Sequence, residues 1–163
     1  MMATRALVGR FDEDARGFRA RPVRVDGQPT WTLQQLARIY TTRFSGDAAV
    51  MHRVLMGQDW STLNAGTTAA VDDRFVYVPG IGRSYPPDEC GAPVGGDRVT
   101  DEPWGAGEWL YLWEHAYGAL HTFVSGAGRW HHLATMPRDL LARADRKLLA
   151  DIEVREWWVR EAW

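Results

Sequence analysis

The side chains best suited to acid–base or metal chemistry in this sequence are its five histidines. Imidazole changes its charge near neutral pH and is a common metal ligand. His131 and His132 are adjacent, so on a strand they point to opposite faces and do not readily share one ion. His115 and His121 flank an expected hairpin turn and could converge with His132. Histidines that only hydrogen-bond locally fit the same pattern, so the sequence assigns no catalytic and no metal-binding residue.

Carboxylates are the second source of possible chemistry. Asp26 lies at a strand-to-helix joint, Asp59 in a turn, and Asp72 and Asp73 just before a strand. Acids in such places usually close turns through their own backbone. An enzymatic alternative remains open: a hydrolase acting on a nucleotide or phosphoester, with Asp26 and Arg5 working beside a histidine of the second hairpin.

Aromatic side chains are the most unusual feature, because the chain of 163 residues contains nine tryptophans. In "EWLYLWE", alternation places Trp109, Tyr111 and Trp113 on one face of a strand. Rings on neighbouring strands can extend this face: His121, Phe123, Trp130 and His132. Two interpretations stay open, a core filled by these rings or a stacking platform for a base, a nucleotide or a partner's side chain.

The first elements that must position these side chains are a hairpin and two helices. "TRALVGRF" and "GFRARPVRV" alternate around "DEDARG", which predicts a β-hairpin over residues 4–25. Thr32 and Gln35 have the spacing of a capping box, which predicts the start of a helix at this point. A second helix is expected to begin at Asp47 and to end at Gly57.

The second half of the chain predicts more strands. "RFVYVPGIG" has the pattern of a strand and turn, "EWLYLWE" and "GALHTFV" that of a second hairpin, and "RWHHLAT" that of a further strand. Between them, residues 86–107 predict a long irregular loop, which is usually functional or disordered. Pro137 suits the first turn of a final helix. We predict a single α+β domain over residues 1–163, with a mainly antiparallel sheet built from two hairpins and packed against about three helices.

Composition limits the classes of partner. A net charge of −2 argues against a broad electrostatic grip on nucleic acid, so this partner is not expected. A nucleic-acid-binding protein that uses an Arg-rich first hairpin remains the third alternative, and its arginines are Arg16, Arg19, Arg21 and Arg24. The sequence has no apolar run long enough for a membrane span and no apolar leader, so a cytoplasmic location is expected. Cys90 stands alone and predicts no internal disulfide.

Four short motifs occur in a distinctive order: "ATRALVGRF", "RVDGQP", "DWSTL" and "EWLYLWE". In this order the chain resembles a family of small, uncharacterised phage and actinobacterial proteins, which open on a Thr-Arg pair and carry a His-Trp-Asp-Gly-Tyr-Pro-like motif. Thr4, Arg5 and Asp26 match that pattern, whereas Arg24 and Gln28 stand where the family has His and Tyr. The resemblance implies a phage or another mobile element as the setting, and it implies no activity.

Taken together, the sequence predicts a non-enzymatic binding protein that contacts a host protein or holds a nucleotide-like small molecule, without a cofactor. A host-modulating or anti-defence role is compatible with the setting that the resemblance implies. The candidate binding residues are Arg5, Asp26, Trp104, Trp109, Tyr111, Trp113, His121, Trp130 and His132. A homodimer through the C-terminal helix would cover three further rings, because large exposed apolar patches usually mark interfaces. These rings are Trp157, Trp158 and Trp163.

Overall fold

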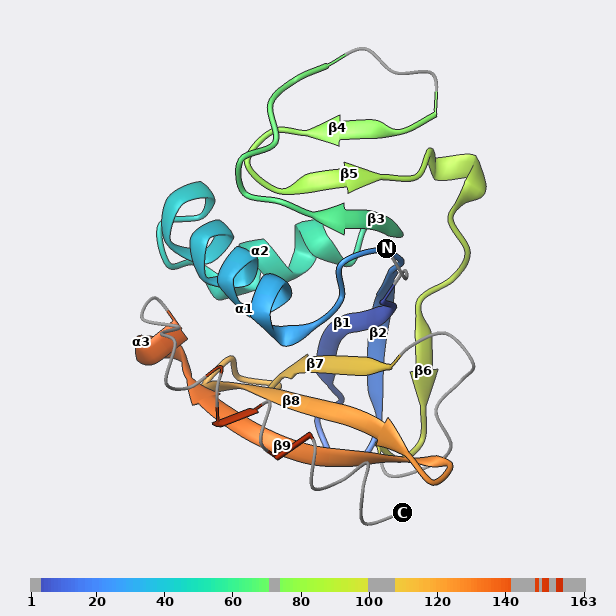
Figure 1. The fold of residues 1–163 in the computed structure, drawn as a ribbon, viewed down its shortest axis with the longest axis vertical. Helices are drawn as coiled ribbons and strands as arrows, with labels where there is room; N and C mark the ends of the chain where they lie inside the picture. Colours follow the sequence, from blue (N-terminus) through green and yellow to red (C-terminus); the bar gives the residue numbers. More distant parts are fainter. Residues whose placement is uncertain are drawn as a thin grey trace.

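The computed structural model describes residues 4–70, 74–99 and 108–141, together with 149, 151–152 and 155–156. Figure 1 shows one continuous mixed sheet in this part of the chain, with two helices held between its two ends. The strands are β1 Ala6–Phe11, β2 Phe18–Val23, β3 Trp60–Leu63, β4 Val76–Val78, β5 Gly82–Ser84, β6 Val94–Gly96, β7 Trp109–Trp113, β8 Ala119–Gly126 and β9 Arg129–Pro137. The helical segments are α1 Pro29–Arg38, the π-helical turn η1 Ile39–Arg43, α2 Ala48–Leu55, the 3-10 turn η2 Pro87–Glu89 and α3 Arg138–Leu141.

The strands follow the order β4-β5-β3-β2-β1-β7-β8-β9, and β6 pairs with the free half of β2. Both expected hairpins form, because β1 pairs with β2 and β7 with β8 in antiparallel register. They are joined by a parallel pairing of β1 with β7, and β2 also runs parallel to β3. The expected fold, a mainly antiparallel sheet against about three helices, is therefore wrong. The nine strands form one mixed sheet, and within the described residues only α1 and α2 reach eight residues.

The joint between β2 and α1 differs from the expected capping box. The helix begins at Pro29, and Thr32 lies inside it, donating from its hydroxyl to the carbonyl of Asp26 at 2.9 Å. Gln35 accepts a hydrogen bond from the backbone N–H of Ala65 at 2.9 Å instead of closing the helix start. Gly27 is needed here for space, since a Cβ would lie 2.7 Å from the Cβ of Ala6.

The second helix begins as expected. The side chain of Asp47 accepts a hydrogen bond from the backbone N–H of Val50, which caps α2. Gly57 follows shortly after the last helical residue, Leu55. Part of the expected irregular loop 86–107 forms the turn η2 and strand β6, and residues 100–107 lie outside the described part. Among the described helices, none has the length and apolar character needed to cross a membrane.

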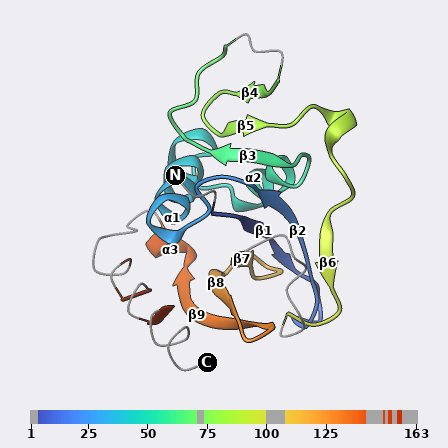
Figure 2. The ribbon, with the colours of Figure 1, turned by 45° about the vertical axis from the view of Figure 1, so that its right-hand side comes forward.

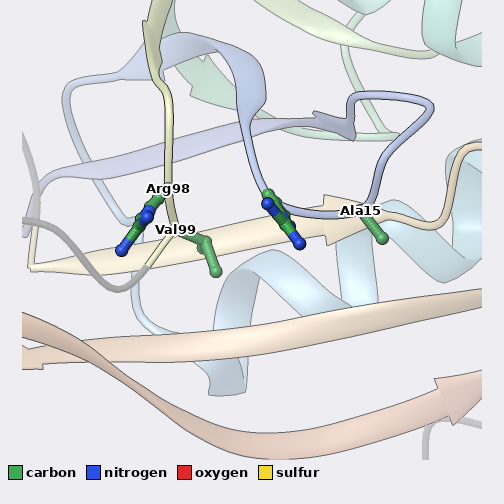
Figure 3. Close-up of a pocket in the computed structure, with 4 residues that line it drawn as sticks. Ala15, Arg98 and Val99 are labelled. Carbon is green, nitrogen blue, oxygen red and sulfur yellow. The ribbon is translucent and has the colours of Figure 1, made fainter.

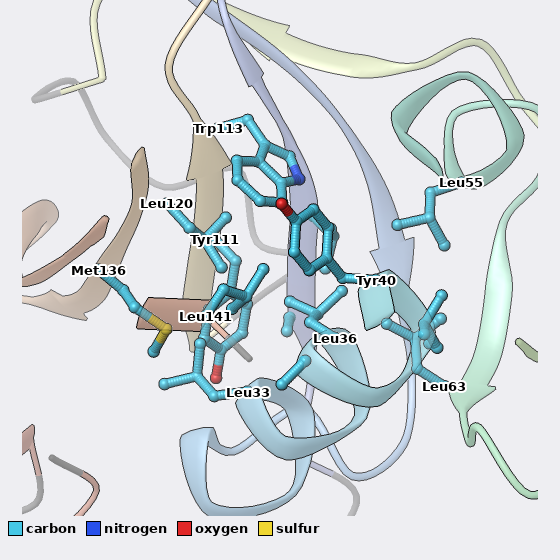
Figure 4. Packing of buried hydrophobic residues seen from close by; sticks show 14 of the residues in the cluster. Leu33, Leu36, Tyr40, Leu55, Leu63, Tyr111, Trp113, Leu120, Met136 and Leu141 are labelled. Carbon is cyan, nitrogen blue, oxygen red and sulfur yellow. The ribbon is translucent and has the colours of Figure 1, made fainter. Parts of the chain in front are cut away.

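A large apolar core lies between the sheet and the two helices, and Figure 4 shows its rings and aliphatic side chains converging from both layers. Alternation along β1 directs Ala6 and Val8 into this core and Leu7 and Phe11 to the opposite face. A second, smaller cluster covers that opposite face. Figure 2 shows that β9, the last strand at one end of the sheet, is strongly curved and that β6 runs along β2. Each face of the sheet therefore has its own set of buried side chains.

Candidate functional site

The three rings of β7 that were candidates for a stacking platform lie in the core. Trp109, Tyr111 and Trp113 have at most 2% of their surface exposed. The hydroxyl of Tyr111 donates to the carbonyl of Gly27 at 2.7 Å, and burial raises the pKa of that hydroxyl well above its ordinary value. Their ring faces are closed to a ligand in this structure. Of the two interpretations left open by the sequence, the structure places these rings in the core.

The register of β7 and β8 separates these rings from the histidine side chains. Trp113 pairs with Leu120 and Tyr111 with Thr122, so His121 and Phe123 point to the other face. There Phe123 belongs to the second apolar cluster, and Trp130 of β9 is buried in the same cluster. The single aromatic face expected from the sequence is thus divided between the two sides of the sheet.

The expected hydrolytic set does not assemble. Asp26 follows β2 near the start of β1, in a left-handed conformation with φ 57°. His121 lies on β8 opposite Leu112, which itself pairs with Gly9 in the second half of β1. Arg5 is exposed, and its carbonyl accepts a hydrogen bond from the N–H of Glu108 at 2.9 Å. The remaining expected residues lie outside the described part of the chain: Trp104, Trp157, Trp158 and Trp163.

The arginines of the first hairpin do not form one surface patch either. Arg21 is buried against Asp59, with Nη1 at 3.1 Å from Oδ1. Its Nε donates to the carbonyl of Met56 at 2.8 Å, and Nη1 also donates to the carbonyl of Gly91. Arg24 lies over the ring of Tyr85, with its Cζ 5.1 Å from the centroid. Arg21 therefore has a structural role and is closed to a phosphate backbone.

A pocket on the helix side of the sheet has the strongest features of a binding site. It has a volume of about 410 Å³, within the range of small-molecule sites. Three elements supply its walls: β1, α2 and the turn between β7 and β8. Its lining residues are Arg10, Ala49, His52, Arg53, Met56, Gly57 and Tyr117, and we call it the Arg10 pocket. No local sequence pattern indicates this pocket, because its lining residues come from distant segments.

Tyr117 holds the guanidinium of Arg10 in this pocket. Nη1 of Arg10 donates to the hydroxyl of Tyr117 at 2.7 Å, and Cζ of Arg10 lies 5.4 Å from the ring centroid. Tyr117 has φ 61°, a left-handed conformation that costs a side chain about 1–2 kcal/mol. The turn holds it there with a hydrogen bond from its N–H to the carbonyl of Glu114 at 2.9 Å. The centroid of its ring lies 6.2 Å from that of Trp113 and 5.7 Å from that of His52.

The electrostatics of the Arg10 pocket favour an anion. Burial, followed by the charge of Arg10, lowers the pKa of His52 to about 4, so this ring is neutral at pH 7. Within the described part of the chain, no carboxylate lies within 4.0 Å of Arg10 or Arg53. The pocket therefore presents two guanidinium groups and two rings, with no acid among its described lining residues.

A second pocket, of about 440 Å³, lies where the β1–β2 turn meets the chain after β6 (Figure 3). Its described lining consists of Ala15, Arg16, Arg98 and Val99, and the N–H of Val99 donates to the carbonyl of Arg16 at 2.7 Å. Its lining residue Val99 directly precedes residues 100–107, which lie outside the described part. Its described lining has two arginines but no aromatic ring, so the Arg10 pocket is the better-defined site.

A cluster of histidines forms on the opposite face of the sheet. Nδ1 of His121 lies 3.0 Å from Nε2 of His132, and Oγ1 of Thr135 lies 3.2 Å and 3.0 Å from these two atoms. Nε2 of His121 is 3.1 Å from Oε2 of Glu114. Burial, together with the nearby His121 and Arg155, lowers the pKa of His132. The expected convergence with His132 is confirmed for His121, whereas no hydrogen bond or ring contact in the described part of the chain joins His115 to this cluster.

Comparisons with protein-family models, with curated proteins and with solved structures give no match for this chain. In the described residues, no group of three or more His, Cys, Asp or Glu side chains is arranged to hold a metal ion.

Proposed function

We propose that the protein is a non-enzymatic binding protein that holds a small, nucleotide-like anion in the Arg10 pocket. The proposal rests on the guanidinium of Arg10, which borders an open pocket and, among the described residues, has a tyrosine hydroxyl as its partner instead of a carboxylate. A guanidinium group has five donors, and the hydrogen bond to Tyr117 uses only one of them. The others can reach a phosphate or carboxylate group, for which the planar guanidinium is well suited.

The rings beside Arg10 favour an anion that also carries a flat group. Tyr117 and His52 are both partly exposed, and their centroids are 5.7 Å apart. Aromatic rings stack on nucleobases with a contribution of about 1–3 kcal/mol per base. A mononucleotide would satisfy both parts of the pocket, with its phosphate near Arg10 and Arg53 and its base near the rings. The resemblance noted in the sequence adds a phage or mobile-element setting, in which binding a host nucleotide would be a host-modulating act.

Binding is tested by calorimetry with four mononucleotides, the corresponding nucleosides and inorganic phosphate. We expect at least one mononucleotide to bind at least tenfold more tightly than its nucleoside, because the nucleoside lacks the group that Arg10 would hold. The variant Arg10→Gln should lose this preference while keeping its fold.

Arg19→Gln is a matched control, since Arg19 pairs directly with Arg10 across the hairpin but does not line the pocket. This variant should bind as the wild type does. Equal losses in the two variants, or no binding of any nucleotide and of phosphate by the wild type, would contradict the proposal.

A further inference from the structure

The histidine cluster on the other face of the sheet is a separate site, and its geometry depends on a β-bulge. Across β8 and β9, His121 pairs with Thr135 and Thr122 with Ala134, but Phe123 pairs with His132. Leu133 is thus the extra residue, and both Leu133 and Ala134 face the large core. The bulge turns His132 to the same face as Thr135 and His121. Bulges often redirect a side chain in this way near functional sites.

We propose that His121, His132 and Thr135 bind a divalent late first-row transition metal with tetragonal preference, of which Cu(II) is the strongest binder. The three facing donor atoms are separated by 3.0, 3.0 and 3.2 Å. With metal–nitrogen bonds of about 2.0–2.1 Å, a 3.0 Å separation subtends an angle of about 94° at the ion. Donors at right angles fit the geometry of Cu(II) and Ni(II) better than the tetrahedral geometry of Zn(II).

The second hydrogen bond of His121 prepares its ring for this role. The carboxylate of Glu114 accepts from Nε2, which places the proton on that nitrogen and leaves the lone pair on Nδ1 facing His132. A carboxylate behind a histidine in this way fixes the tautomer and makes the ring a better ligand. Without a metal, Nε2 of His132 can donate to Nδ1 of His121. When a metal binds, the proton of His132 moves from Nε2 to Nδ1, and the metal takes its place at Nε2. His132 is neutral before and after, so metal binding requires no loss of a proton from this ring.

Apolar rings surround the cluster on its sheet side. Phe11 meets the ring of His121 edge-on at 5.5 Å, and Phe123 meets His132 at 5.2 Å. His132 itself is exposed, so an ion can enter from solvent. The charge of Arg155, whose guanidinium donates to the carbonyl of Leu133, opposes a cation and lowers the affinity. Two imidazoles and one hydroxyl leave further positions for water, which predicts moderate affinity.

The site is tested by titrating tag-free full-length protein with Cu²⁺, Ni²⁺ and Zn²⁺ and by recording the electron paramagnetic resonance spectrum of the Cu²⁺ form. We expect one ion to bind per chain, with a higher affinity for Cu²⁺ than for Ni²⁺ or Zn²⁺. The spectrum of the Cu²⁺ form should show hyperfine coupling to two nitrogens. His132→Ala should weaken Cu²⁺ binding at least tenfold and leave coupling to a single nitrogen. Glu114→Gln should weaken binding about tenfold, as is usual for the loss of such a supporting carboxylate.

His115→Ala serves as the control, because His115 is exposed in the same hairpin turn and has no described contact with the cluster. This variant should bind Cu²⁺ as the wild type does, and unfolding curves should show that each variant is folded. Failure of the wild type to take up one Cu²⁺, or unchanged affinity in His132→Ala, would overturn the proposal. In that case the two rings form only a hydrogen bond to each other. Nucleotide binding in the Arg10 pocket is measured independently of either result.

Discussion

Two arginines of the same hairpin have opposite environments. Arg21 of β2 is closed in by Asp59 and two backbone carbonyls, whereas Arg10 of β1 borders an open pocket and, among the described residues, has only Tyr117 as a hydrogen-bond partner. Both point to the helix side of the sheet, and Met56 at the end of α2 accepts from Arg21 and also lines the Arg10 pocket. The difference separates a guanidinium whose donors are taken up by the chain from one that still has donors to offer, which is why the proposal places the ligand at Arg10 and not at Arg21.

The largest effect is expected from breaking the buried pair. Asp59→Ala leaves the charge of Arg21 buried without its carboxylate, and removal of one partner from a buried ion pair costs about 3–5 kcal/mol. Chemical denaturation should show this loss in the free energy of unfolding. The matched variant Arg10→Gln should change the free energy of unfolding by less than about 1 kcal/mol, because that guanidinium is partly solvated. Similar losses in both variants would remove the distinction between the two arginines.

The next effect concerns the pH dependence of the open site. The pKa of His52 is about 4 in the folded protein and about 6.5 when unfolded, so the unfolded chain binds the extra proton between these values. The free energy of unfolding should therefore fall as the pH drops from about 6.5 to about 4. Below about pH 4, His52 is protonated in both states and should cause no further loss. For this half-exposed ring we expect a loss of about 1–2 kcal/mol relative to His52→Gln. Denaturation of both proteins across this pH range measures it; parallel curves would show that His52 is not held neutral.

A smaller effect is expected from the hydroxyl that holds Arg10. Tyr117→Phe keeps the ring beside His52 but removes the acceptor of the 2.7 Å hydrogen bond. The loss should be about 0.5–1 kcal/mol in the free energy of unfolding, together with weaker mononucleotide binding in calorimetry. Tyr85→Phe offers a control on another exposed arginine–tyrosine contact, that of Arg24. If Tyr117→Phe bound nucleotide as the wild type does, Arg10 would not need Tyr117 for its orientation.

The smallest change in stability should come from making the open arginine resemble the buried one. Ala49 is exposed in the first turn of α2 and lines the pocket, so Ala49→Glu places a carboxylate near Arg10 and Arg53. An acid in the first turn of a helix and near two cations should stabilise the fold by about 0.3–1 kcal/mol. At the same time it should weaken mononucleotide binding at least tenfold by competing for the guanidinium groups. Ala49→Gln controls for side-chain size, and undiminished binding by Ala49→Glu would place the ligand elsewhere.

Local patterns in the sequence were sufficient for the hairpins and for one helix start. Alternation around "DEDARG" predicted the pairing of β1 with β2, and Asp47 caps α2 as expected. The capping box at Thr32 failed because Pro29 starts the helix one turn earlier and the side chain of Gln35 is used by Ala65. The mixed character of the sheet also lay beyond local patterns, since the two hairpins meet through a pairing between distant segments.

The candidate sites show the same division. Convergence of His121 and His132 could be anticipated from the expected β8–β9 pairing, but the bulge at Leu133 that brings them to one face has no signature in "RWHHLAT". The Arg10 pocket was missed because β1, α2 and the β7–β8 turn meet only in the folded protein. The aromatic alternation of β7 was correct as a pattern, yet it could not show that helices cover that face.

The parallel pairing of β1 with β7 has a consequence for synthesis in the cell. Ala6 and Trp109 are neighbours in this pairing although about 100 residues separate them along the chain. At a ribosomal rate of about 5–20 residues per second, β1 has to wait roughly 5–20 seconds after its own emergence before β7 exists. During that interval the unpaired edge of β1 is a template for other nascent strands, which exposes the first hairpin to aggregation.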